Sequence, residues 1–212
     1  MESPLCPPAD RGFRLIETGL WTPGDGLHRK AMHLERLHAS AARLGIGIDG
    51  LEAALEAVEA DRPRRLRLTV DAGGQVEVTL HDFTPEPEGR ALRLAMSEAR
   101  LIATDPWLTV KSTERALYDR TRADLPEGVD EVIFLNTDGA VCEGTITNVF
   151  VDRGDGLETP ALSCGVLPGV LRASLIVEGR AREAVLSPKD LAEARALYVG
   201  NALRGLIPAR LV

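Results

Sequence analysis

Three short segments of the chain carry residue types that can do chemistry together. Lys111 follows the apolar run WLTV, Glu143 opens the polar turn EGTITN, and the segment GVLPGVLR begins at Gly165. An amine in an apolar setting can attack an aldehyde, a carboxylate can pair with a ring nitrogen, and a helix N-terminus can bind phosphate. An aldehyde, a ring nitrogen and a phosphate are the reactive parts of pyridoxal 5′-phosphate, so the three segments favour a site for that cofactor.

Each segment also has an ordinary structural explanation. Lys111 fits an exposed lysine at a strand end, Glu143 fits a turn carboxylate that caps backbone N–H groups, and residues 165–172 fit a helix start without a ligand. The chain has only two other lysines, Lys30 and Lys189, and both lie in predicted helices among polar neighbours. Lys111 is therefore the choice for a catalytic amine, if the chain has one.

A fourth candidate, Arg36, lies on a predicted helix over residues 29–44, beside its apolar stripe. It is either a solvated or surface-paired arginine, or an arginine that clamps a phosphate through a charge-assisted contact. The polar residues after Glu143 are candidates to hold the ring oxygen and the phosphate: Thr145, Thr147 and Asn148. The four histidines and three cysteines form no catalytic triad and no metal-ligand spacing, so we predict neither a hydrolase nor a metal site.

Bulk composition narrows the class of protein. The 212 residues carry a formal net charge of -7, which disfavours nucleic-acid binding because a phosphate backbone attracts basic surfaces. Three sparse cysteines are typical of free thiols in a reducing compartment. No apolar run approaches the roughly 20 residues of a membrane span, and no signal peptide is recognised. We therefore expect a cytoplasmic protein that acts on a small molecule, away from membranes.

Periodicity predicts a mixed α and β chain. The first half reads as a strand over 13–21, the helix over 29–44 with Gly45 as its cap, and a second helix capped by Asp49. A hairpin follows, because Leu66–Val70 and Val76–Leu80 alternate apolar and polar residues around a Gly-Gly turn.

The Pro- and Glu-rich residues 84–90 place the domain boundary. We predict a small α/β domain over 1–84, a linker over 85–90 and a larger domain over 91–212. In the second half, strands are expected near 92–96, 131–135, 148–151, 157–160, 197–199 and 205–209. Helices are expected over 113–123 and 169–179 and after Ser187, with Pro188 first and Asp190 close to a capping box.

The order of these parts along the chain resembles a known family. The parts are the ET pair at 17–18, HLERLHASAARLG from His33, K-x3-R from Lys111, DEVIFLNTDGAVCEGTITNVF from Asp130, TPALSCGVLPGVLR from Thr159 and GNALRG from Gly200. Together they are similar to the class IV aminotransferases, the fold-type IV pyridoxal-phosphate enzymes, over nearly the whole chain from about Gly12. The chain is short for that family, and its first strand is expected to be curtailed.

The resemblance implies an α+β fold, with a small α/β domain and a larger pseudo-barrel domain, the cofactor between them, and a homodimer. It implies that Lys111 holds the cofactor, that Glu143 pairs with the ring nitrogen and that Arg36 binds the phosphate. The remaining cofactor contacts that it implies come from Thr147, from Val170 and Leu171 at the helix start, and from Asn201 and Ala202 in the late turn.

Within the family, KSTERALYD, LSCGVLPGVLR and GNALRG look most similar to the lyase-like members, including domains fused to aminodeoxychorismate synthase. Our first hypothesis is a lyase that converts 4-amino-4-deoxychorismate to 4-aminobenzoate and pyruvate, toward folate, with Thr18 assisting proton transfer. Arg204 is either a ligand of a substrate carboxylate or a surface residue. One alternative is an aminotransferase for a D- or branched-chain amino acid, and the other is a cofactor-binding module with little turnover.

Overall fold

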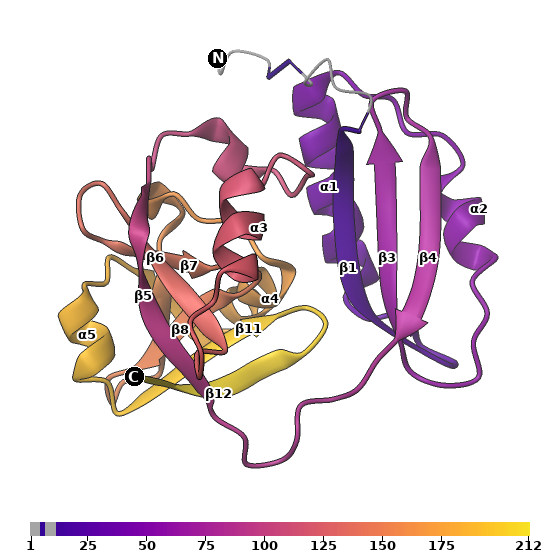
Figure 1. Cartoon of the computed structure of the whole chain (residues 1–212). Helices are drawn as coiled ribbons and strands as arrows, with labels where there is room; N and C mark the ends of the chain where they lie inside the picture. The colour runs from indigo at the N-terminus through magenta and orange to yellow at the C-terminus, as the bar shows by residue number, and fades with distance from the viewer. Residues whose placement is uncertain (1–4, 7–11) are drawn as a thin grey trace. The chain divides into compact units, whose positions relative to one another are not determined.

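The computed structural model describes residues 5–6 and 12–212. The chain divides into two compact units (Figure 1). The first comprises Met1–Thr84 and Val110–Glu114, and the second comprises Pro85–Thr109 and Arg115–Val212. The short segment Val110–Glu114 therefore leaves the second half of the sequence to join the first unit, and it contains Lys111.

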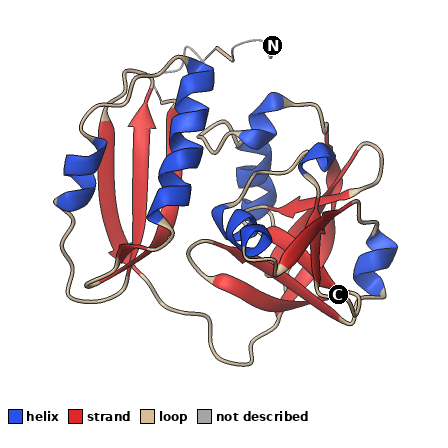
Figure 2. Cartoon of the chain, turned by 180° about the vertical axis from the view of Figure 1, so that it is seen from behind, coloured by secondary structure: helices blue, strands red, loops and turns tan. Residues whose placement is uncertain are grey.

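An antiparallel sheet of order β2-β1-β3-β4 forms the first unit, and α1 runs alongside its strands (Figure 2). The period-two pattern predicted the hairpin correctly, since Leu66, Leu68 and Val70 are fully buried. The elements are β1 (Arg14–Thr22), β2 (Gly26–Leu27), α1 (Lys30–Leu44), α2 (Leu51–Glu56), β3 (Arg64–Asp71) and β4 (Val76–Asp82).

The helix ends of the first unit follow the predicted signals in one case and depart from them in the other. Helix α1 ends at Gly45, which has φ 67° and donates its N–H back to Ala41 and Ala42, as a left-handed cap does. Helix α2 was predicted to be capped by Asp49, and this was wrong. Its N-cap is Gly50 at φ 72°, where an L side chain is strained.

Residues Val110–Glu114 are extended along β1. The Ile16 N–H donates to the Lys111 carbonyl at 2.8 Å, the Thr113 N–H donates to the Arg14 carbonyl at 2.9 Å, and Leu15 is bridged to Ser112. Because Thr113 is engaged in this pairing, the helix predicted from residue 113 begins only at Ala116, as α3 (Ala116–Ala123). That prediction of the helix start was therefore wrong by one turn.

The second unit is built on a closed barrel. Its sheet has the order β10-β9-β8-β11-β12-β5-β6-β7, and an additional pairing of β7 with β8 closes six of these strands, with β9 and β10 attached outside β8. The strands are β5 (Leu92–Leu101), β6 (Glu131–Asn136), β7 (Val141–Gly144), β8 (Asn148–Asp152), β9 (Leu157–Pro160), β10 (Ala181–Ala184), β11 (Ala196–Asn201) and β12 (Gly205–Leu211). The expected α+β fold with a barrel-like larger part is confirmed.

Apolar side chains from most of these strands fill one core cluster, including Leu94, Ile133, Val149 and Val199, each fully buried. The helical segments around the barrel are η1 (Pro106–Thr109), α3, η2 (Leu162–Cys164), α4 (Val170–Val177) and α5 (Pro188–Ala192). The capping box predicted at Ser187 and Asp190 is present. None of the helices in residues 5–6 and 12–212 combines the length and the apolar character that a membrane span requires.

Candidate active site

Glu143 lies on β7 with only 5% of its surface exposed. Its Oε1 accepts a hydrogen bond from the Tyr118 hydroxyl at 2.8 Å. Its Oε2 accepts from the backbone N–H of Leu167 at 3.0 Å and from Nδ2 of Asn148 at 3.3 Å. Donated hydrogen bonds favour the charged form of a carboxyl group, and these three donors fix both of its oxygens. The site therefore presents a buried, oriented carboxylate, which suits a protonated ring nitrogen.

Asn148 connects this carboxylate to the start of α4. It pairs with Glu143 across β7 and β8, and its Nδ2 also donates to the Leu167 carbonyl at 3.1 Å. A Cβ atom on Gly169, the N-cap of α4, would lie 1.8 Å from Oδ1 of Asn148. Only glycine fits there, so the sequence LPGV sets the helix start against the residue that orients Glu143.

The turn that follows Glu143 is organised by a second buried carboxylate, Glu131, which is 1% exposed. Glu131 accepts from the Thr145 N–H at 3.0 Å, from the Thr145 hydroxyl at 2.6 Å and from the Thr147 hydroxyl at 3.2 Å. Thr147, which the sequence predicted beside the cofactor, is thus a member of this Glu131-centred turn. Its partner Glu131 was not recognised from the sequence.

Three backbone segments of the second unit converge near this turn. Nδ2 of Asn201 donates to the Ile146 carbonyl at 3.2 Å, which joins the β11–β12 turn to the Thr147 turn. A Cβ atom on Gly200 would lie 2.8 Å from Cδ2 of Leu171, which places the end of β11 against the first turn of α4.

The first turn of α4 suits an anion. Among the described residues, no side chain caps this helix start and its first turn contains no acidic residue. Its N–H groups and dipole favour a phosphate at Val170 and Leu171. The groups present therefore fit a phosphorylated pyridine, because the second unit contains both a helix start that favours an anion and a buried carboxylate.

The β11–β12 turn contains Ala202 and Arg204. Oδ1 of Asn201 accepts from the N–H groups of Leu203 and Arg204, at 3.1 and 3.0 Å, which closes the turn around Ala202. Nε of Arg204 lies 3.1 Å from a carboxylate oxygen of Glu86, and the arginine side chain is 29% exposed. Arg204 is thus ion-paired and only partly exposed, and its predicted contact with a substrate stays a prediction.

Arg36 of the first unit is part of a buried network around Glu17. Nε and Nη2 of Arg36 donate to the two oxygens of Glu17 at 2.9 and 2.6 Å, and Nδ1 of His33 lies 2.6 Å from Oε2. Burial opposes the charge on Glu17, yet Arg36 and His33 hold the pKa of that carboxyl below its usual value. Arg36 is accordingly fixed in direction, and His33 is fully buried on α1.

Lys111 is half-buried, between the buried residues Val110 and Ser112. Thr18, also half-buried, lies on β1 opposite Arg67 of β3. The structure therefore assigns Thr18, Arg36 and Lys111 to the first unit. It assigns the other predicted site residues to the second unit, namely Glu143, Thr147, Val170, Leu171, Asn201, Ala202 and Arg204.

Three polar residues of these networks were missed in the sequence: Glu17, Tyr118 and Glu131. Glu17 carried a signal, because it is an acidic residue within an apolar strand next to Thr18. Tyr118 and Glu131 carried none, because each meets its partner across 14 or more residues of sequence.

The fold and this site define a class of enzyme. A model of the family described as amino-transferase class IV matches residues 14–212, so the chain belongs to this family. The enzymes of the family use pyridoxal 5′-phosphate, which confirms the predicted cofactor and the expectation that the chain is an enzyme.

Particular relatives carry two different names. The chain is 29% identical over 202 residues to a protein of Schizosaccharomyces pombe provisionally named an aminodeoxychorismate lyase, covering 90% of this chain and 86% of the relative. A crystal structure from Mesorhizobium loti, provisionally named an amino-acid aminotransferase, is 45% identical with a TM-score of 0.88. That match covers 94% of this chain and all of the other. A 46-residue segment is 52% identical to the aminodeoxychorismate lyase of Bacillus subtilis, covering 22% of this chain and 16% of that protein.

Proposed function

We propose that the chain is a pyridoxal-phosphate-dependent lyase that converts 4-amino-4-deoxychorismate to 4-aminobenzoate and pyruvate. The observation that carries this choice is the similarity over 90% of the chain to the Schizosaccharomyces pombe protein named for that reaction. The matching segment of the Bacillus subtilis lyase supports it. The buried Glu143 and the open start of α4 fit the cofactor that this reaction needs.

In this proposal each residue has a chemical task. The amine of Lys111 would hold the cofactor through its aldehyde, and the same amine would serve as the base that removes the proton from the substrate carbon that bears nitrogen. Glu143 keeps the ring nitrogen protonated, and Thr18 assists proton transfer. When bound, the cofactor supplies an electron sink for the pair left on that carbon. The bond from the substrate ring to the pyruvyl oxygen then breaks, pyruvate leaves and the ring becomes aromatic.

The remaining residues bind and orient. The N–H groups of Val170 and Leu171 and the guanidinium of Arg36 hold the phosphate. The turns that contain Thr147, Asn201 and Ala202 complete that contact, and Arg204 binds a substrate carboxylate. We further propose a cytoplasmic homodimer in the folate pathway, supplied with substrate by aminodeoxychorismate synthase.

An aminotransferase is the second candidate, favoured by the Mesorhizobium loti structure at 45% identity. Both reactions begin with removal of a proton from the substrate carbon that bears the amino group. They then differ in the leaving product, because a transaminase releases a keto acid and retains the amino group for a second substrate. The choice depends on which substrate the pocket accepts.

The test begins with Lys111→Ala, which removes the proposed anchoring amine. The unaltered protein should show the visible absorbance band of lysine-bound cofactor, and the variant should lack it. Lys189→Ala is the matched control, because that side chain is 78% exposed on α5. The absence of a band in the unaltered protein would exclude a cofactor enzyme and leave the binding-module alternative without support.

The substrate assay then separates the two reactions. The unaltered protein, given 4-amino-4-deoxychorismate, should release pyruvate and 4-aminobenzoate in equal amounts. If neither product forms, while D- or branched-chain amino acids yield keto acids, the aminotransferase is the correct assignment.

A further inference from the structure

Helix α3 directs three polar side chains at the strand and turn that contain Glu143. Arg115, Tyr118 and Arg122 are spaced by three and four residues, so they share one face of the helix start and the helix. Arg115 donates to the Thr145 carbonyl at 2.9 Å and Arg122 donates to the Thr145 hydroxyl at 3.0 Å. Tyr118, between the two arginines, donates to Oε1 of Glu143 at 2.8 Å.

The Tyr118 ring is held firmly, so its hydroxyl has little freedom. The ring packs edge-on against the fully buried Phe134 at a centroid distance of 5.1 Å, and the Arg115 guanidinium lies 5.8 Å from its centroid. Burial first, and then the charge of Glu143, raise the pKa of the phenol far above its usual value. The hydroxyl thus stays protonated, and its proton is directed at the carboxylate.

We propose that Tyr118 is a positioning residue for Glu143, whose phenol fixes the direction and the charge of the carboxylate that faces the cofactor ring nitrogen. This inference rests on the role of Glu143 in the proposed function. A hydrogen bond to Oε1 spreads the negative charge and disfavours protonation of the carboxyl group. The proton shared between Glu143 and the ring nitrogen therefore stays on the nitrogen, where it makes the ring a better electron sink.

If Tyr118 only tethered α3 to the strand, the expected results would be different. Arg115 and Arg122 already attach α3 to Thr145 on either side of Tyr118. If Tyr118 only added a third attachment, its hydroxyl could be removed with some loss of stability and no change in the protonation of Glu143 or of the ring nitrogen. A stability measurement alone would therefore not separate the two roles.

The test compares Tyr118→Phe with Tyr198→Phe. The chain has two tyrosines, and Tyr198 on β11 packs half-buried beside a different cluster, which contains Phe150 and Leu171. With 15N-labelled cofactor bound, Y118F should shift the ring-nitrogen resonance toward the unprotonated value and lower kcat about 10-fold, with KM nearly unchanged. Y198F should leave the resonance and kcat as they are.

A second readout needs no cofactor. In the cofactor-free protein, 13C-labelled glutamate reports on Glu143, with Glu143→Gln to identify its resonance. The carboxyl group should take up its proton at a higher pH in Y118F than in the unaltered protein or in Y198F. An unchanged titration, or an unchanged ring-nitrogen resonance, would overturn the role of Tyr118.

The two proposals fail in different ways. If the unaltered protein binds no cofactor, the proposed function is wrong and so is the role of Tyr118 toward the ring. If the cofactor binds and reacts normally in Y118F, only the role of Tyr118 is wrong. In the Glu143→Gln background, Y118F should cause no further fall in kcat, because its effect acts through that carboxylate.

Discussion

Two buried carboxylates of the second unit, Glu143 and Glu158, have similar burial and different partners. They are 5% and 4% exposed. Glu143 accepts from three neutral groups, the Tyr118 phenol, the Asn148 amide and the Leu167 N–H. Glu158 accepts from two arginines, with Nε of Arg153 at 2.6 Å and Nη2 of Arg182 at 2.9 Å.

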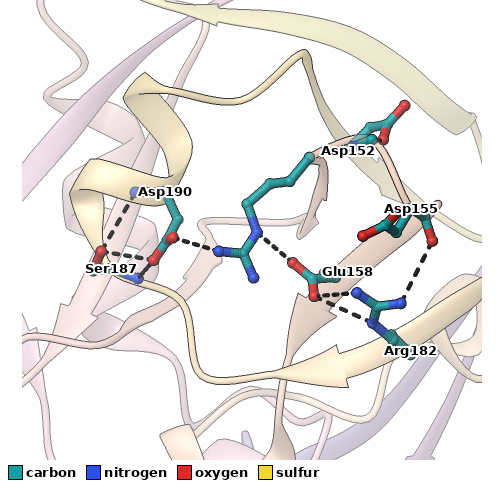
Figure 3. Close-up of polar contacts among 8 residues, drawn as sticks. Asp152, Asp155, Glu158, Arg182, Ser187 and Asp190 are labelled. Carbon is teal, nitrogen blue, oxygen red and sulfur yellow. Dashed lines mark hydrogen bonds and ion pairs between the residues drawn. The ribbon is translucent and has the colours of Figure 1, made fainter.

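The arginines extend Glu158 into a network (Figure 3). Nη1 of Arg153 also donates to Asp190 at 2.7 Å, and Asp190 accepts from the Ser187 hydroxyl at 2.7 Å, which ties the β8–β9 turn to α5. Cations cancel the charge of Glu158 within the fold. The Tyr118, Asn148 and Leu167 donors to Glu143 are neutral, and they orient the carboxylate and favour its charged form. We therefore expect Glu158 to act in stability, in contrast to the catalytic role proposed for Glu143.

Glu143→Gln should have the largest effect on activity. The amide keeps the shape of the side chain and removes its charge, so kcat should fall about 100-fold, the scale of losing a preorganised electrostatic contact. Unfolding should become easier by only about 1 kcal/mol, since one hydrogen bond is impaired. Steady-state kinetics and urea unfolding measure the two quantities. If kcat were equal in the variant and the unaltered protein, Glu143 would have no role in activity that distinguishes it from Glu158.

Glu158→Gln should show the reverse pattern. It leaves two arginines with an uncharged partner, and the free energy of unfolding should fall by about 2 kcal/mol while kcat of the folded enzyme is kept. Glu178→Gln is the control, because Glu178 pairs with Arg180 at side-chain exposures of 44% and 60%. An exposed pair of this kind should contribute under about 1 kcal/mol.

The stabilising effect of Glu158 should also depend on pH. Its hydrogen bond to Arg153, and then that to Arg182, hold the pKa of Glu158 below the usual value against the effect of burial. A carboxyl group with a lowered folded-state pKa stabilises the protein fully above the unfolded value of about 4.3, and loses that effect as pH falls through the folded value. The difference in the free energy of unfolding between E158Q and the unaltered protein should therefore disappear in acid. A difference that stays constant with pH would contradict the ion-pair explanation.

The smallest effect concerns Cys142, the neighbour of Glu143. Burial first, and then the charge of Glu143, raise the pKa of this thiol to about 12. At pH 8 an alkylating reagent should label the exposed Cys6 and spare the buried Cys142 and Cys164 until the protein unfolds. In Glu143→Gln the thiol pKa should fall by less than about one unit, as measured by the pH dependence of its alkylation. Labelling of Cys142 in the native unaltered protein would contradict its burial beside a charged carboxylate.

Local signals in the sequence predicted much of the fold. The apolar stripe and Gly45 defined α1, alternation defined β3 and β4, and Ser187 with Asp190 defined the start of α5. These signals act within one turn or one pair of strands. Pairing with a distant segment carries no such signal, and the start of α3 was misplaced because Thr113 is bonded to Arg14. Strand β10 was missed because two of its four residues are polar and exposed.

The site was predictable where a residue type is rare or a motif is specific. Lys111 stood out among three lysines, and Glu143 and Gly169 lie in distinctive segments. The partners that orient them did not stand out, because they lie far away in the sequence and in no recognisable motif. Tyr118 is 25 residues from its acceptor. The domain limits 1–84 and 91–212 and the roles of single site residues stay predictions.

The barrel closes where β7 meets β8, and the residues paired at that seam are Glu143 and Asn148. The opposite side of the ring depends on distant segments, because Ala209 of β12 lies in register with Leu92 of β5. On the ribosome, the hairpin that contains Glu143 emerges well before the last strand. The ring cannot close until β12 has been synthesised. Binding competence should therefore arise only once β12 has been synthesised, and a nascent chain stalled before residue 205 should not retain the cofactor.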